Sequence, residues 1–209
     1  METYLEALDE FFCAQYSDYV RISAIEGYEM PDVVYVAPDG NVARRDSSCM
    51  RLKYQKNRDA ILKTLKNSLA DTTFTFNYKF IPLMQRPRER FRKETFAKLL
   101  PEILKHTGET AESAGKKLDI EPKFWRLIVK GKVWPEKNTV LALALVCRMQ
   151  VADVNRLFAV LNLGFEEDNV RDVVVQFLLG QRIFNEQMRD KCLSEYKIEN
   201  LPIARGEEL

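Results

Sequence analysis

At 209 residues, with 46% hydrophobic and 30% charged residues, the chain has the composition of a globular protein with material for two modest domains. No apolar run approaches the ~20 residues that a membrane span needs, and the N-terminal residues lack the features of a secretory signal, so we expect a cytoplasmic protein with no membrane partner. The single histidine excludes a zinc finger of the Cys/His type. The four cysteines stand far apart without a C-x-x-C pair, which favours reduced structural thiols over disulfides.

The net charge of +1 conceals an uneven distribution along the chain. Residues 1–50 carry three basic groups against ten acidic ones, residues 51–85 carry seven against two, and residues 86–137 carry fourteen against eight. A basic middle therefore lies between two acidic ends. Such a middle can follow a phosphate backbone or dock on the acidic N-terminal part of the same chain, and composition alone does not choose between the two.

The first 85 residues mix the patterns of helices and strands, which predicts a small α+β domain. Apolar residues at three- and four-residue spacing predict helices, whereas β-branched and aromatic runs or strict alternation predict strands. The predicted elements are a helix over 4–16, a short strand around Val20–Ile25, a strand over Pro31–Val36 that stops at Pro38-Asp39-Gly40, a helix over Leu52–Leu69, and a strand over Thr72–Ile81 with Phe74, Phe76, Tyr78 and Phe80 on one buried face.

Residues 86–93 form the predicted boundary between two domains. The segment contains a proline and no aliphatic residue, and its arginines are Arg86, Arg88, Arg90 and Arg92. The pattern favours two interpretations about equally: a solvated linker, or an arm that contacts phosphate.

Residues 94–209 are predicted to form an all-helical domain, because no strand pattern follows Phe96. Thr110 is a suitable N-cap, Pro122 suits the first position of a helix, and Gly131 suits its end. The predicted helices cover residues 94–105, 110–118, 122–130, 136–149, 151–163, 169–179 and 184–196.

Two of these helices, joined by the tight turn Asp119-Ile120-Glu121, form a candidate helix-turn-helix. On a helical wheel of the second helix, three cations share one narrow sector, with Phe124 and Ile128 predicted to face the bundle. Trp125 and Trp134 are interpreted as core aromatics. The predicted DNA-binding residues around the turn are Lys116, Lys117, Lys123, Arg126, Lys130 and Lys132.

This part of the chain resembles the lambda-repressor-like, XRE-type helix-turn-helix family. The resemblance covers about residues 94–163 and rests on the helix ending Val129-Lys130-Gly131-Lys132, on Pro135, and on the alanine- and leucine-rich run Thr139–Leu145. The chain from Thr110 to Ile203 is also similar to a bacterial module found at the C-terminus of otherwise unrelated proteins. The shared positions are Ile120, Lys123, Phe124, Trp125, Ile128, Pro135 and Thr139, followed by two extra helices that end in Leu201-Pro202-Ile203.

The resemblance implies a lambda-repressor-like bundle that binds double-stranded DNA, in many members as a twofold dimer. The chain departs from the family at Val129, where an acidic residue is usual, and at Ala111, where a phosphate-clamping glutamine is common.

We therefore expect a DNA-binding transcriptional regulator of bacterial or phage type. The alternative is a protein-interaction module that keeps the helix-turn-helix fold and presents its basic surface to an acidic protein partner; the absence of Asn and Gln from the second helix favours this alternative. We expect no enzyme activity, catalytic residue, metal or cofactor, because Asp32 and Asp39 fit turns better than a carboxylate cluster and no glycine-rich phosphate loop is present.

Overall fold

The structure is a computed structural model in which most of the described residues are helical. It describes residues 3–26, 34–36, 42–44, 59–69, 78–82, 84 and 93–198. Contacts divide the chain into two compact units, Met1–Ala70 and Asp71–Leu209. Within the described residues no helix is long and apolar enough to cross a bilayer.

In the first unit, α1 (Thr3–Gln15) and α2 (Ser17–Glu26) are followed by β1 (Val34–Val36), β2 (Val42–Arg44) and a helical segment over 59–68. The helix predicted over 4–16 is confirmed, and β1 falls within the strand predicted over Pro31–Val36. β1 and β2 pair antiparallel, with Tyr35 opposite Ala43. The predicted turn Pro38-Asp39-Gly40 and the start of the predicted helix at Leu52 lie outside the described residues.

The short strand predicted around Val20–Ile25 is wrong, because these residues belong to α2. Strand propensity is a weak preference that local interactions readily override. In α2, the Arg21 guanidinium donates to the Asp18 carboxylate at 3.0 Å across one helical turn, and Tyr19 is buried. Both interactions stabilise the helical conformation over the extended one.

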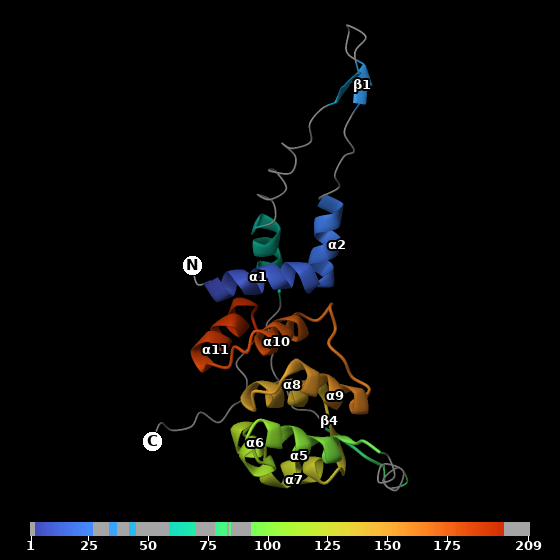
Figure 1. The fold of residues 1–209 in the computed structure, drawn as a ribbon, viewed down its shortest axis with the longest axis vertical. Helices are drawn as coiled ribbons and strands as arrows, with labels where there is room; N and C mark the ends of the chain where they lie inside the picture. The colour runs from blue at the N-terminus through green and yellow to red at the C-terminus, as the bar shows by residue number, and fades with distance from the viewer. Residues whose placement is uncertain are drawn as a thin grey trace. The chain divides into compact units, whose positions relative to one another are not determined.

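The second unit contains β3 (Tyr78–Phe80), α5 (Phe96–His106), α6 (Ala111–Lys117), α7 (Pro122–Val129), β4 (Val133–Pro135), α8 (Lys137–Val146), α9 (Val151–Leu161), α10 (Val170–Gly180) and α11 (Glu186–Glu195). Figure 1 shows its helices in successive layers, with α5, α6 and α7 in the first, α8 and α9 in the second, and α10 and α11 in the third. All seven helices predicted after residue 94 are present, each within a few residues of its predicted bounds.

The central helix of the second unit is α8. Every residue from Thr139 to Val146 is buried, and α8 packs against α6, α9 and α10. A helix that is apolar all round is stable only inside a core. Its C-cap, Cys147, is 1% exposed, and burial raises the pKa of this thiol to about 12. Cys192 is buried as well, as expected for structural thiols, whereas Cys49 lies outside the described residues.

The prediction that no strand follows Phe96 is wrong. Val133–Pro135 forms β4, which pairs antiparallel with β3, so that Phe80 lies opposite Val133 and Lys79 opposite Trp134. A strand of three residues is too short to show an alternating pattern, and its partner precedes it by more than fifty positions in the sequence. The contact division lies between Ala70 and Asp71, so that β3 belongs to the same unit as β4, whereas the sequence predicts a linker over residues 86–93.

The predicted strand Thr72–Ile81 is described only at its end. Phe80 was expected on a buried face, but its side chain is 58% exposed, whereas Ile81 is buried. The expectation assumed a wide sheet with one covered face. The observed sheet of β3 and β4 has two strands in the described residues, which leaves Phe80 at its margin. Phe74 and Phe76 lie outside the described residues.

A buried ionic cluster joins the start of α8 to the start of α10. The ammonium of Lys137 lies 2.8 Å from a carboxylate oxygen of Asp172 and 2.8 Å from one of Glu166. Burial raises the pKa of Asp172, which is 1% exposed, although hydrogen bonds from Lys137 and from the backbone N–H of Glu166 oppose the shift. Burial also works against the charge on Lys137, but its hydrogen bonds to the two carboxylates outweigh burial and raise its pKa.

Candidate nucleic-acid interface

The candidate interface is built on α6, α7 and the turn between them. Thr110 caps α6: its hydroxyl accepts from the backbone N–H of Ser113 at 3.1 Å, and the Ser113 hydroxyl accepts from the backbone N–H of Thr110 at 3.0 Å. This reciprocal pair satisfies two of the N–H groups that a helix leaves unpaired at its start. It fixes where α6 begins, as predicted from Thr110.

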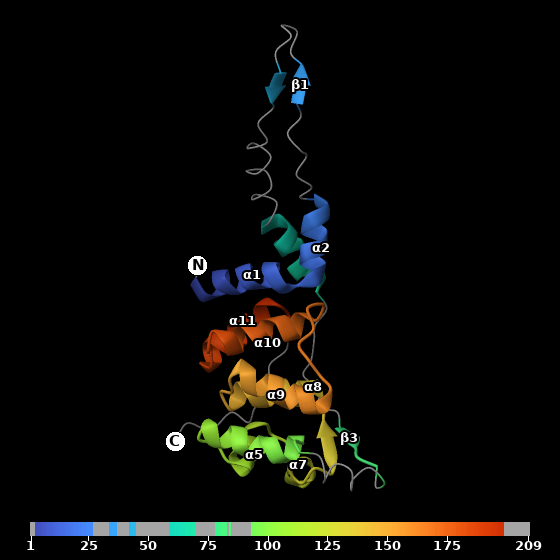
Figure 2. The same ribbon diagram turned by 45° about the vertical axis from the view of Figure 1, so that its right-hand side comes forward.

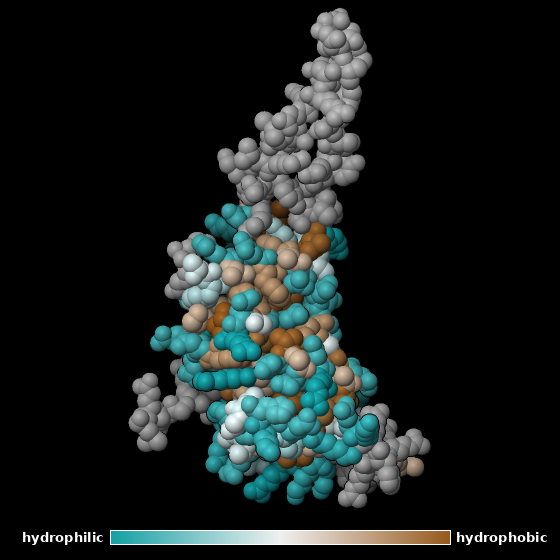
Figure 3. Space-filling model, in the orientation of Figure 1, coloured by the Kyte–Doolittle hydropathy of each residue, from teal (hydrophilic) through white to brown (hydrophobic). Residues whose placement is uncertain are grey.

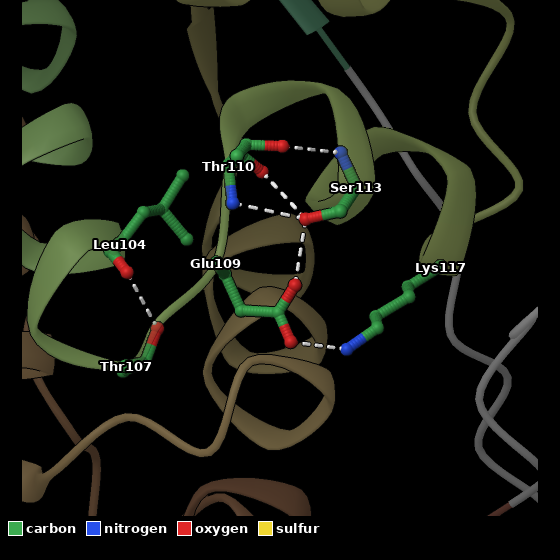
Figure 4. Close-up of polar contacts among 6 residues, drawn as sticks. All are labelled: Leu104, Thr107, Glu109, Thr110, Ser113 and Lys117. Atoms are coloured by element: carbon green, nitrogen blue, oxygen red, sulfur yellow. Dashed lines mark hydrogen bonds and ion pairs between the residues drawn. The ribbon is translucent and has the colours of Figure 1, made fainter.

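Glu109 adds an anionic anchor beside this cap (Figure 4). Its carboxylate accepts from the Ser113 hydroxyl at 2.6 Å and forms an ion pair with Lys117 at the other end of α6. Hydrogen bonds from Lys117, which has the larger effect, and from Ser113 hold the pKa of Glu109 below its usual value. The positive charge of Lys117 is therefore engaged within the protein.

The turn between α6 and α7 follows directly from the local sequence. Asp119 takes a left-handed conformation with φ of 50°, which aspartate tolerates better than most residues. Ile120 is then buried, and Pro122 occupies the start of α7, where its missing N–H carries no penalty. The turn thus ends one helix and starts the next within four residues.

A single close contact locks α7 against α6. The Trp125 indole N–H donates to the backbone carbonyl of Ala111, and the Trp125 side chain is 6% exposed. A methyl group built on Gly115 would lie 2.6 Å from Nε1 and 2.8 Å from Cγ of that indole. Only glycine therefore leaves room for the ring between the two helices. The expectation that Trp125 is a core aromatic is confirmed, whereas Trp134 on β4 is half-buried.

The buried face of α7 consists of Trp125 and Ile128, so one part of the helical-wheel prediction is wrong. Phe124 was expected to face the bundle but is 37% exposed. The preceding turn sets the rotation of a short helix about its own axis. Here that rotation places the indole of Trp125 in the space against α6. The rotation places Phe124 at the border of the exposed face.

The exposed face of α7 carries three cations. Lys123, Arg126 and Lys130 are all exposed, and none has an ion-pair partner among the residues that the structure describes. Lys132, in the turn after Gly131, is exposed and likewise has no ion pair within residues 93–198. The part of the surface formed by α5, α6 and α7, at the bottom of the view in Figure 3, is mainly hydrophilic.

The two lysines of α6 behave differently from these four cations. Lys116 lies 3.0 Å from Glu112, with both side chains largely exposed, and Lys117 is paired with Glu109. An exposed pair such as Lys116–Glu112 is weak and can exchange its partner for a phosphate, whereas the Lys117 pair is reinforced by Ser113. Among the residues that the structure describes, the six predicted cations around the turn therefore divide into four without an ion pair and two that are paired.

Gly131 ends α7 and turns the chain into β4. Its φ of 62° is in the left-handed region, and a methyl group built on it would lie 3.1 Å from the Cβ of Ala97 at the start of α5. The backbone N–H of Lys132 donates to the carbonyl of Leu127 at 2.9 Å. The end of α7 thus contacts the first turn of α5 and leads through a three-residue turn into β4.

The predicted basic arm is not described by the structure. Arg86, Arg88, Arg90 and Arg92 lie outside the described residues, as do the closing residues Leu201-Pro202-Ile203 of the similar module. The sequence pattern does not assign Lys79 or Phe80 to the interface; both lie on β3 beside β4. No local signal identifies them, because their position depends on pairing between distant segments.

No protein family matches the chain, and comparison with curated proteins and with solved structures finds no significant match.

Proposed function

We propose that the chain is a DNA-binding transcriptional regulator of bacterial or phage type that acts in the cytoplasm and places α7 in the major groove of double-stranded DNA. The observation that carries the proposal is the set of three exposed cations on α7, Lys123, Arg126 and Lys130, without an ion-pair partner in the described residues. Solvated cations grouped on one helix face, opposite a face held by Trp125, can replace the counterions of a phosphate backbone.

The composition of α7 narrows the kind of base contact it can make. The helix contains no Asn or Gln, the side chains that pair with adenine. Arg126 can donate two hydrogen bonds to the acceptor pair of guanine, and a lysine can donate to the same edge. We therefore expect guanine in the preferred target, with Lys130 and Lys132 contacting phosphates.

The fold class belongs to the same proposal. A tight α6–α7 pair, packed on α5 and covered by α8 and α9, supports a lambda-repressor-like bundle with α10 and α11 added. An α+β class for the N-terminal unit is supported by helices α1 and α2 together with the antiparallel β1–β2 pair. A twofold dimer is the arrangement in which two such helices reach successive half-sites.

An acidic protein partner is the second candidate. Phe124, 37% exposed at the border of the cationic face, favours it, because a mixed apolar and basic surface suits a protein interface. The two candidates differ in the ligand that α7 binds: duplex DNA in one, and an acidic polypeptide in the other.

Fluorescence anisotropy with a pool of labelled duplexes over a salt series tests the proposal. The full chain is compared with Lys123→Ala/Arg126→Ala/Lys130→Ala, and with Arg182→Asn as a control that removes one exposed cation from the turn between α10 and α11. We expect log affinity to fall steeply with log salt, and the triple variant to lose about 0.9 of slope for each phosphate contact removed. The control should retain the slope of the unaltered chain.

Absence of binding by the unaltered chain at low salt would overturn the DNA proposal. Equal slopes for the unaltered chain and the triple variant would overturn the assignment to α7. In either case the next measurement is competition by an acidic peptide for the same surface.

A further inference from the structure

The pairing of β3 with β4 brings a distant segment to the end of α7. β4 begins two residues after Gly131 and contacts α7, and the backbone N–H of Ile81 donates to the carbonyl of Lys132 at 3.1 Å. Figure 2 shows β3 beside β4 at this end of the unit. Lys79 and Phe80 therefore lie within a few residues of Lys132 in the register, although more than fifty positions separate them in the sequence.

Two exposed side chains on β3 have no evident structural purpose. Lys79 is exposed and has no ion pair within the described part of the second unit, and Phe80 is 58% exposed. A phenylalanine buries a large apolar surface in a core and gains nothing from water. A single exposed apolar residue is common on protein surfaces, but Phe80 is next to an exposed lysine and in register with the segment that follows α7, which places it to extend a contact made by α7.

The charged side chains of the ribbon itself are all positive. Residues 78–82 (YKFIP) and 129–135 (VKGKVWP) contain Lys79, Lys130 and Lys132 and no acidic residue, and the first acidic residue after β4 is the exposed Glu136. An anionic ligand that extends from α7 to the Lys132 end of the ribbon therefore meets three cations and no carboxylate within these two segments. Two-stranded ribbons are also narrow enough to lie along or within a groove of DNA.

We infer that the β3–β4 ribbon is a second DNA-contacting element that extends the surface of α7. Successive strand residues point to opposite faces, so a ribbon that enters a groove edge-on presents Lys79 to the phosphates of one wall and Phe80 to the sugars or base edges of the other. The inference rests on the proposed DNA-binding function and adds to it a contact residue of each kind: a cation that orients the complex, and an apolar group that contributes independently of salt.

Substitutions at two positions separate these contributions. In the anisotropy series, Lys79→Ala should reduce the magnitude of the salt slope by about 0.9, and Lys79→Arg should restore it. Phe80→Ala should weaken binding by about fivefold at every salt concentration and leave the slope unchanged. Thermal unfolding should show both variants as stable as the unaltered chain, since neither side chain is buried.

The possible results distinguish this inference from the proposal on which it rests. If the unaltered chain does not bind duplex DNA, both fail. If it binds and the α7 triple variant loses slope, but Lys79→Ala and Phe80→Ala bind like the unaltered chain and like Arg182→Asn, the ribbon contact alone is overturned. Failure of Lys79→Arg to restore the slope would also contradict a phosphate contact at Lys79.

Discussion

The second unit uses charge in two opposite ways. At the junction of α8 and α10, the buried Asp172 and the largely buried Lys137 side chain lie 2.8 Å apart. On α7, Lys123, Arg126 and Lys130 are exposed and have no ion pair in the described part of the unit. Buried charges are tolerated only when they are paired, so the first group is explained by the fold. The second group is solvated and contributes little to the fold, which leaves these side chains available for the DNA contact that we propose.

The largest effect is expected at the buried pair. Lys137→Met should lower the free energy of unfolding by about 3–5 kcal/mol, because it leaves the Asp172 carboxylate buried without its cation. The double variant Lys137→Met/Asp172→Leu should recover much of the loss. Chemical denaturation measures both; a loss below about 1 kcal/mol in the single variant would contradict the description of the cluster as structural.

The same pair predicts a pH dependence. Burial raises the pKa of Asp172 in the folded chain, and Lys137→Met removes a group that opposes this shift. The folded variant then binds a proton more tightly than the unfolded chain does, so its stability increases as pH falls through the raised pKa of Asp172 toward the unfolded value near 3.8. The deficit of Lys137→Met should therefore shrink as pH is lowered.

The next effect concerns the packing that holds α7 in place. Gly115→Ala should destabilise the chain by about 1–3 kcal/mol, because the added methyl group overlaps the rigid indole of Trp125. Gly180→Ala is the matched control, since a methyl group there meets no atom within 4 Å. Thermal unfolding of the two variants should differ in this direction, and an equally stable Gly115→Ala would show that α6 and α7 are not in such close contact.

A smaller effect is expected at Glu109. Glu109→Gln removes the charge that holds Lys117 and should lower stability by about 1 kcal/mol at neutral pH. The lowered pKa of Glu109 stabilises the folded chain above 4.5 and stops doing so as pH falls through the folded value. The difference in stability between Glu109→Gln and the unaltered chain should thus disappear at acidic pH. Glu112→Gln, at the exposed pair with Lys116, should have almost no effect at any pH.

The smallest effect on stability is expected for the cations of α7. Lys123→Ala/Arg126→Ala/Lys130→Ala should unfold within about 0.5 kcal/mol of the unaltered chain, because exposed side chains without partners contribute little. Calorimetry alongside the anisotropy measurement checks this. A large loss of stability would show that these side chains have a structural role, and the contrast between the two groups of charges would then fail.

Local signals in the sequence predicted much of the helical part of the fold. Thr110 caps α6 and Pro122 starts α7, both as expected from short-range chemistry. The exposed positions of Lys123, Arg126 and Lys130 also followed from helical periodicity.

The remaining features depend on contacts that the sequence does not reveal. Lys117 is paired because the turn before α6 brings Glu109 to it, eight positions away. Phe124, which was expected to face the bundle, is exposed because Gly115 leaves space for the indole of Trp125 against α6. The ribbon of β3 and β4 depends on pairing between three-residue segments, for which no periodic pattern exists.

That ribbon also gives the unit an order of assembly. Helices form from contacts between near neighbours, but Tyr78 must find Pro135 across more than fifty residues, and the entropy of closing that loop is recovered by only three pairs of residues. The strands of the ribbon should pair last in folding and separate first in native fluctuations, while α5, α6 and α7 stay folded. The surface that Lys79 and Phe80 present next to Lys132 would then exist for only part of the time, and the free energy of one short strand pairing would set that fraction.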